Sequence, residues 1–180
     1  MTTGHAIELL FDTDSERRIV HVWRAIGGGS DLEAVGGRPH LSLALIRPPG
    51  DPEVLATCVE KLSGKMKPMR LELSAVGAFP GDEGVVFLAP AVTSELVDAH
   101  AELHEILREC GVTADELYQP GRWVPHCTVA LHVPPNEVPA AVEVVRGSAV
   151  FGPINVEGIS LVEFLPVEVI LSTRLGNEEA

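Results

Sequence analysis

Two histidines, each followed two positions later by a hydroxyl residue, are the side chains of this chain best suited to chemistry. The pairs are His40 with Ser42 and His126 with Thr128. An imidazole titrates near neutral pH, so it can give or accept a proton. Two imidazoles on opposite sides of a phosphodiester could act as general base and general acid, while the hydroxyls stabilise the non-bridging oxygens. Such chemistry needs no metal, and we expect neither a metal nor another cofactor.

Both pairs lie in segments that repeat one another. Residues 39–49 read PHLSLALIRPP, and residues 125–135 read PHCTVALHVPP. Alternation with a period of two predicts a strand in each segment, with the imidazole and the hydroxyl on one face about 7 Å apart and apolar side chains on the other. Two such strands, related by internal duplication, would bring the two pairs together across one cleft.

The elements around these segments also recur in the same order. The pattern predicts a first strand at 6–11, and each half then reads as helix, loop, motif strand, helix and a strand pair. We expect the glycine-rich segment 27–39 to be a mobile loop. The expected helices are 15–26, 52–63, 92–110 and 136–146, and the expected strand pairs are 69–79 with 85–89 and 154–164 with 167–174.

This order predicts an α+β fold. We expect a single bilobal domain over residues 1–180, with two pseudo-twofold-related lobes of antiparallel sheet plus helices around a central cleft. The repeated halves span approximately residues 12–90 and 92–175. The helix that precedes a motif strand can pack on the other lobe.

The amino-acid composition of the chain limits the kinds of molecule that it can bind. The net charge of −13 argues against a face that grips long nucleic acid through its phosphates. We therefore expect a small cyclic nucleotide or an RNA terminus as the substrate, and a monomeric protein. There is no run of 18 apolar residues and no export signal, so we expect no membrane contact and a cytoplasmic location. An odd count of three widely spaced cysteines fits reduced thiols.

The duplicated motifs, HLSL and HCTV, resemble those of the 2H phosphoesterase superfamily, which includes bacterial 2′-5′ RNA ligase-like proteins and RNA 2′,3′-cyclic phosphodiesterases. The order of elements is similar from about residue 5 to residue 175. The resemblance implies that His40 and His126 are catalytic and that Ser42 and Thr128 bind the substrate phosphate. It also implies a cyclic phosphodiesterase that opens 2′,3′-cyclic phosphates to 2′-phosphates, with 2′-5′ joining of RNA ends in some members.

Four residues on the loops before the motifs are further candidates for substrate binding. Arg38 and Arg122 could contact phosphate or be ordinary surface charges. Tyr118 and Trp123 could stack on a base, although Trp123 could equally pack in the core.

Two rival hypotheses remain at this point. The same cleft could bind a terminal or cyclic phosphate without turnover; the acidic charge and the absence of an arginine shortly after the second motif favour this alternative. A metal-dependent hydrolase could use His100 and His104, but Ala101 stands where the zincin pattern has glutamate. His132 should lie on the same strand face as His126, about 20 Å along at ~3.3 Å per residue, and is expected at the surface.

Overall fold

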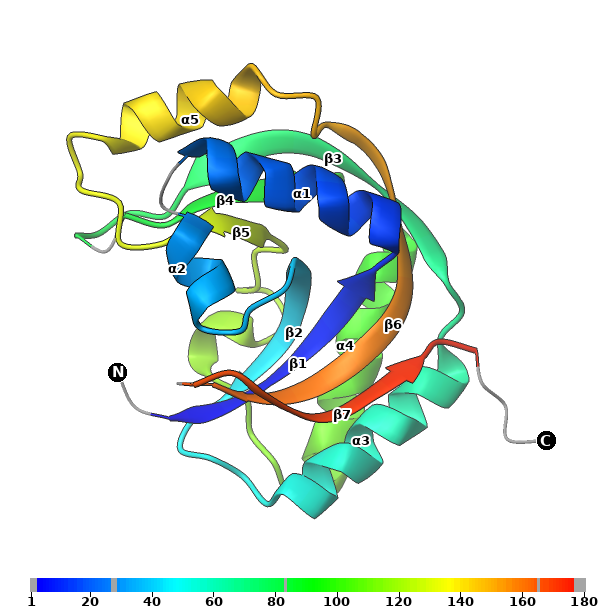
Figure 1. Cartoon of the computed structure of the whole chain (residues 1–180). Coiled ribbons are helices and arrows are strands. Elements are labelled where there is room, and N and C mark those ends of the chain that lie inside the picture. Colours follow the sequence, from blue (N-terminus) through cyan, green and yellow to red (C-terminus); the bar gives the residue numbers. More distant parts are fainter. Residues whose placement is uncertain (1–2, 27–28, 83, 165, 177–180) are drawn as a thin grey trace.

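The computed structural model describes residues 3–26, 29–82, 84–164 and 166–176, and in them seven strands form one antiparallel sheet (Figure 1). The strand order is β2-β1-β6-β3-β4-β5, and β7 also pairs with β6. The α+β class with antiparallel strands is confirmed, whereas the division into two lobes stays a prediction. The strands are β1 (Gly4–Phe11), β2 (His40–Ile46), β3 (Met69–Ala78), β4 (Val86–Pro90), β5 (Cys127–Ala130), β6 (Gly152–Phe164) and β7 (Glu168–Arg174).

Helices cover the sheet, and side chains cap the starts of α3 (Pro52–Lys65) and α4 (Ser94–Glu109). Asp51 accepts a hydrogen bond from the Glu53 amide at 2.9 Å at the start of α3, and Thr93 accepts one from the Leu96 amide at 3.2 Å at the start of α4. Among the described residues, no helix is long and apolar enough to cross a membrane. The helices are α1 (Thr13–Ile26), α2 (Gly29–Ala34), α3 (Pro52–Lys65), α4 (Ser94–Glu109) and α5 (Val138–Arg146), with a 3₁₀ turn η1 (Glu116–Tyr118).

The strand order is symmetric about the pairing of β6 with β3. The segments β1-α1-β2-α3-β3 and β4-α4-β5-α5-β6 follow the same order along the chain, and each motif strand lies at one end of the sheet path. Helix α1 packs on α5 and β5 of the second segment, while α4 packs on α3 of the first. The helix before each motif strand therefore packs on the other half, as the sequence suggested.

The curvature of the sheet brings its two end strands, β2 and β5, into contact. Two tryptophans hold them there. Trp23 of α1 donates its indole N–H to the Thr128 carbonyl at 3.1 Å, and Trp123 donates to the Ser42 carbonyl at 3.0 Å. Each motif strand is thus fixed through the backbone of its hydroxyl residue.

The apolar faces of the motif strands belong to the core, as the alternation predicts. Leu41 and Leu43 of β2, and Cys127 and Val129 of β5, are almost wholly buried. Burying an aliphatic side chain of this size stabilises the fold by about 1.5–3 kcal/mol. This burial sets which face of each strand the histidine and the hydroxyl occupy.

Two local expectations are wrong. The segment 27–39 contains helix α2, and its residues 27–28 lie outside the described residues. The second motif strand covers only Cys127–Ala130, because the chain turns at His132, whose φ of 55° is left-handed. His132 is therefore not on a strand face with His126, although it is exposed at the surface as expected.

Candidate active site

The two motif histidines are held by the same local hydrogen bond. His40 begins β2, and its Nδ1 lies 2.7 Å from the Arg38 carbonyl oxygen; His126 directly precedes β5, and its Nδ1 lies 2.7 Å from the Val124 carbonyl oxygen. A carbonyl oxygen only accepts, so Nδ1 donates in both rings. Each ring therefore keeps Nε2 for another partner, and the backbone two residues earlier fixes its orientation.

The two rings lie close enough for the charge of one to affect the other. Burial lowers the pKa of His126, and positive charge on His40 lowers it further. The ring of His126 packs edge-on against Phe79 at 4.8 Å between centroids and against Phe87 at 5.5 Å. Both histidines are half-buried and still reach solvent. The site thus holds one imidazole whose surroundings favour its neutral form beside a second imidazole.

The two hydroxyl residues differ in exposure. Ser42 is 7 % exposed, whereas Thr128 is half-buried opposite Phe87 of β4. Burial raises the pKa of Tyr118 to about 12, so its phenol keeps its proton near neutral pH. Tyr118, a candidate for base stacking, lies near the site, because Ser42 and Glu8 both affect its pKa and η1 contacts β2.

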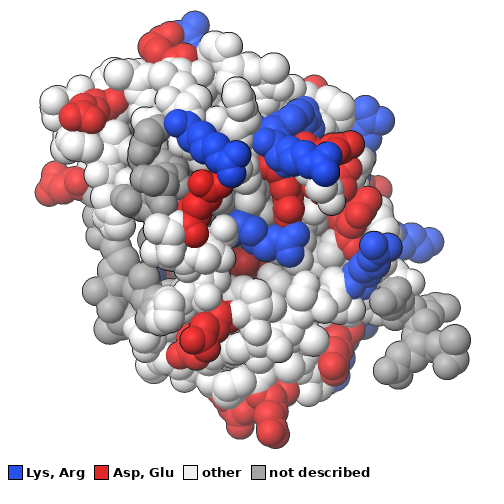
Figure 2. All heavy atoms as spheres, viewed as in Figure 1, with Lys and Arg blue, Asp and Glu red and all other residues white. Residues whose placement is uncertain are grey.

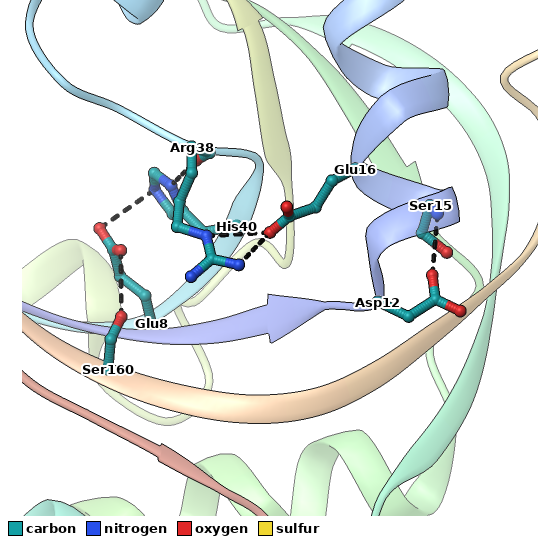
Figure 3. Close-up of polar contacts among 7 residues, drawn as sticks. All are labelled: Glu8, Asp12, Ser15, Glu16, Arg38, His40 and Ser160. Atoms are coloured by element: carbon teal, nitrogen blue, oxygen red, sulfur yellow. Dashed lines mark hydrogen bonds and ion pairs between the residues drawn. The ribbon is translucent and has the colours of Figure 1, made fainter.

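Glu8 is a site residue that the sequence did not single out. It lies on β1 opposite Ser42, its side chain is almost wholly buried, and its Oε1 is 3.4 Å from His40 Nε2 (Figure 3). Ser160 of β6 donates to its other oxygen at 3.5 Å. Burial raises the pKa of Glu8. A signal for it was present, because one acidic residue stands inside the otherwise apolar run AIELLF.

The two candidate arginines are already paired. Arg38 Nε donates to Glu16 of α1 at 2.9 Å beside His40 (Figure 3), and Arg122 pairs with Glu116. Basic and acidic side chains are similarly interspersed over the face drawn in Figure 2. The Arg38 guanidinium lies near the site, whereas Arg122 is an exposed partner of η1. Phosphate contact by either arginine stays a prediction.

One face of the Trp123 ring packs against another side chain of the protein. It stacks on His100 with centroids 4.0 Å apart and an interplanar angle of 3°. His100 Nε2 lies 2.9 Å from the Tyr118 carbonyl oxygen, and its ring is 4.4 Å from that of His104. Over the described residues, no group of three or more potential ligands could hold a metal ion. His100 instead anchors the loop that carries Tyr118 and Trp123.

A small cavity of about 80 Å³ lies beside His40 and Glu8. Its polar lining also includes Ser160 and Ser172 from the adjoining strands β6 and β7, and three valines close its apolar side. The cavity therefore extends from His40 and Glu8 across the sheet to β6 and β7, with a few polar groups in a mainly apolar lining.

Several solved structures share this fold. Escherichia coli LigT complexed with 3′-AMP is 15 % identical, with 97 % of this chain and 99 % of LigT covered at a TM-score of 0.63. TT0787 of Thermus thermophilus is 19 % identical over 98 % and 100 % of the two chains, with a TM-score of 0.62. Kluyveromyces marxianus Usb1 is 10 % identical, with 96 % of this chain and 97 % of Usb1 covered at a TM-score of 0.51.

At the level of sequence, a comparison with curated proteins finds no match. The family model of the 2′-5′ RNA ligase superfamily, however, matches residues 11–166. That span contains both motifs and every strand of the sheet from β2 to β6. The chain therefore belongs to the 2′-5′ RNA ligase superfamily, the 2H phosphoesterases.

Proposed function

We propose that this protein is a metal-independent cyclic phosphodiesterase that hydrolyses a 2′,3′-cyclic phosphate, on a small nucleotide or an RNA terminus, to a 2′-phosphate. His40 and His126 supply the general acid and the general base, and Ser42 and Thr128 bind the non-bridging phosphate oxygens. The observation that carries this proposal is the duplicated hydrogen bond from Nδ1 to the backbone, which orients both rings in the same way and leaves Nε2 of each without a backbone partner.

The related structures support a substrate of this size. LigT has been solved with 3′-AMP, with phosphate, with ATP and with NADP+. The net charge of −13 and the pairing of both candidate arginines favour a compact anion over a long nucleic acid. A substrate that offers one phosphate to two imidazoles and two hydroxyls satisfies these limits.

The direct test is turnover of 2′,3′-cyclic nucleotides in the presence of EDTA. We expect each substrate molecule to yield one nucleoside 2′-phosphate, which ³¹P NMR and chromatography distinguish from the 3′-isomer. A chelator should leave the rate unchanged, because no step uses a metal. Saturable binding of the cyclic nucleotide without product would instead support the rival hypothesis of a phosphate-binding module.

The two hydroxyls should contribute measurably to this reaction. A hydrogen bond to a charged oxygen is worth about 1.5–3 kcal/mol, so we expect Ser42→Ala and Thr128→Val each to lower kcat/KM by roughly 10- to 100-fold. The exchanges Ser42→Thr and Thr128→Ser keep a hydroxyl at each position and should retain most activity. Wild-type kcat/KM in both hydroxyl-free variants, with unchanged melting temperatures, would remove these residues from the mechanism.

A further inference from the structure

The two halves of the sheet differ at one matched position beside the hydroxyl residues. On β1, Glu8 lies opposite Ser42 of β2; on β4, Phe87 lies opposite Thr128 of β5. The neighbouring strand therefore supplies a carboxyl group in one half and a phenyl ring in the other. Because the backbone holds both histidines in the same way, this position is where their chemistry can diverge.

The carboxyl group of Glu8 is removed from water and has few partners. All eight residues of β1 are buried, and Glu8 itself is 5 % exposed. His40 Nε2 is 3.4 Å from Oε1, and Ser160 donates to Oε2 (Figure 3). A buried carboxylate is costly unless a proton or a cation compensates it. The Glu8–His40 pair therefore retains one proton between Oε1 and Nε2.

That proton remains available to a bound substrate. His40 Nδ1 already donates to the Arg38 carbonyl, so the proton shared with Glu8 is the one at Nε2. The 3.4 Å separation is longer than the ~2.7–2.9 Å of a strong charge-assisted hydrogen bond. The His40 side chain is also 29 % exposed. Nε2 can thus pass its proton to a substrate oxygen without breaking a tight internal bond.

His126 has the opposite surroundings. Its ring lies edge-on against Phe79 and Phe87, with interplanar angles of 85° and 63°. Neither phenyl ring carries a formal negative charge, so neither compensates a positive charge on His126 as a carboxylate would. Burial accordingly lowers the pKa of His126, and His40 lowers it further. At neutral pH its Nε2 therefore carries a free lone pair.

We propose that Glu8 makes His40 the general acid and that Phe87, at the matching position, leaves His126 as the general base. This assignment rests on the proposed function. His126 Nε2 removes a proton from water, and the water oxygen forms a bond to phosphorus. The bond from phosphorus to the ribose 3′ oxygen breaks, and that oxygen takes its electron pair and the proton from His40 Nε2. His40 then regains a proton and His126 loses one to solvent.

Few other charged groups surround the Glu8–His40 pair. Arg38 faces it from the loop before β2, but Glu16 of α1 already pairs with this guanidinium. Tyr118 and Cys127 also lie near the pair, and burial raises the pKa of each, so both stay neutral. The titratable groups that act on the pair or are acted on by it are Arg38, Glu16, Tyr118, His126 and Cys127.

The test is the Glu8→Gln variant, which keeps the size of the side chain and its ability to bond to Ser160. The pH profile of kcat/KM should be bell-shaped in the wild type, with an acid limb set by the base and an alkaline limb set by the acid. In Glu8→Gln we expect the alkaline limb to move to lower pH by about one unit or more, because an opposite charge has been removed from the acid. The acid limb should not move.

Phe87→Leu is the matched control in the other half. It keeps the position apolar but loosens the packing on His126, so only the acid limb should move, toward higher pH. An NMR titration of the imidazole Cε1–H signals gives a second readout that needs no turnover. There, the Glu8→Gln substitution should change the His40 signal more than the His126 signal, because Glu8 lies 3.4 Å from His40 Nε2.

Two results would overturn this assignment. One is a Glu8→Gln profile that is lower at every pH with both limbs in place, which is the mark of a purely structural residue. The other is a displaced acid limb, which would exchange the two roles. An inactive wild type would instead refute the proposed function, and a His40 NMR signal that is the same in Glu8→Gln and in the wild type would refute the Glu8–His40 pair independently.

Discussion

Replacing His126 with alanine is expected to lower kcat/KM for a 2′,3′-cyclic nucleotide by about 10²- to 10⁴-fold, and His40→Ala should have an effect of the same size. Each substitution removes the Nε2 that gives or takes a proton in the displacement. Both rings act in one step, so the loss in the double variant should be far smaller than the product of the single losses. Initial rates with EDTA present, measured from pH 5 to pH 9, provide the test.

Loss of activity through misfolding has to be distinguished from loss of a proton carrier. His126 packs against Phe79 and Phe87, so His126→Phe preserves an aromatic ring there while removing both nitrogens. It should be as inactive as His126→Ala but more stable. His21, which is exposed on α1, supplies the control His21→Ala, with wild-type kinetics expected. Retention of more than a tenth of the wild-type kcat/KM by both motif variants would exclude two-histidine catalysis.

The order of helices and strands could be predicted because it rests on local periodicity. Helix α3 shows this well: its apolar positions recur every three or four residues, and Asp51 and Pro52 mark its start. The prediction failed where a local signal misled. Glycines at both ends of segment 27–39 concealed helix α2, and the apolar residues after Ala130 suggested a longer strand than the turn at His132 permits.

The candidate motif residues could be selected from the sequence because duplication placed the same pattern twice in the chain. Their environments could not, because these depend on strand pairing between distant residues. Glu8 meets Ser160 only through the pairing of β1 with β6, and Trp23 reaches the Thr128 carbonyl from a helix in the other half. The difference between Glu8 and Phe87 becomes visible only when the sheet register shows that they occupy matching positions.

The cluster of His100, His104 and Trp123 should make the fold sensitive to acid. His100 is 3 % exposed, and burial, with a smaller contribution from His104, lowers its pKa to about 4. An unfolded histidine has a pKa of about 6.5. Between these values the unfolded chain binds a proton that the folded chain does not, so acid favours unfolding. The stability that His100 contributes is fully present above pH 6.5 and falls as the pH decreases toward 4, by up to about 3 kcal/mol.

Urea unfolding at pH 7.5, 5.5 and 4.5 measures this effect when His100→Asn is compared with the wild type. The carboxylates titrate in both proteins, so the difference between their pH dependences isolates His100, and the wild type should lose more stability on acidification. His21→Asn should behave as the wild type does, because the ring of His21 is exposed. Parallel pH dependences in all three proteins would refute a buried neutral His100. Since His100 holds Trp123, and Trp123 holds the Ser42 carbonyl, activity should be lost in the same acidic range.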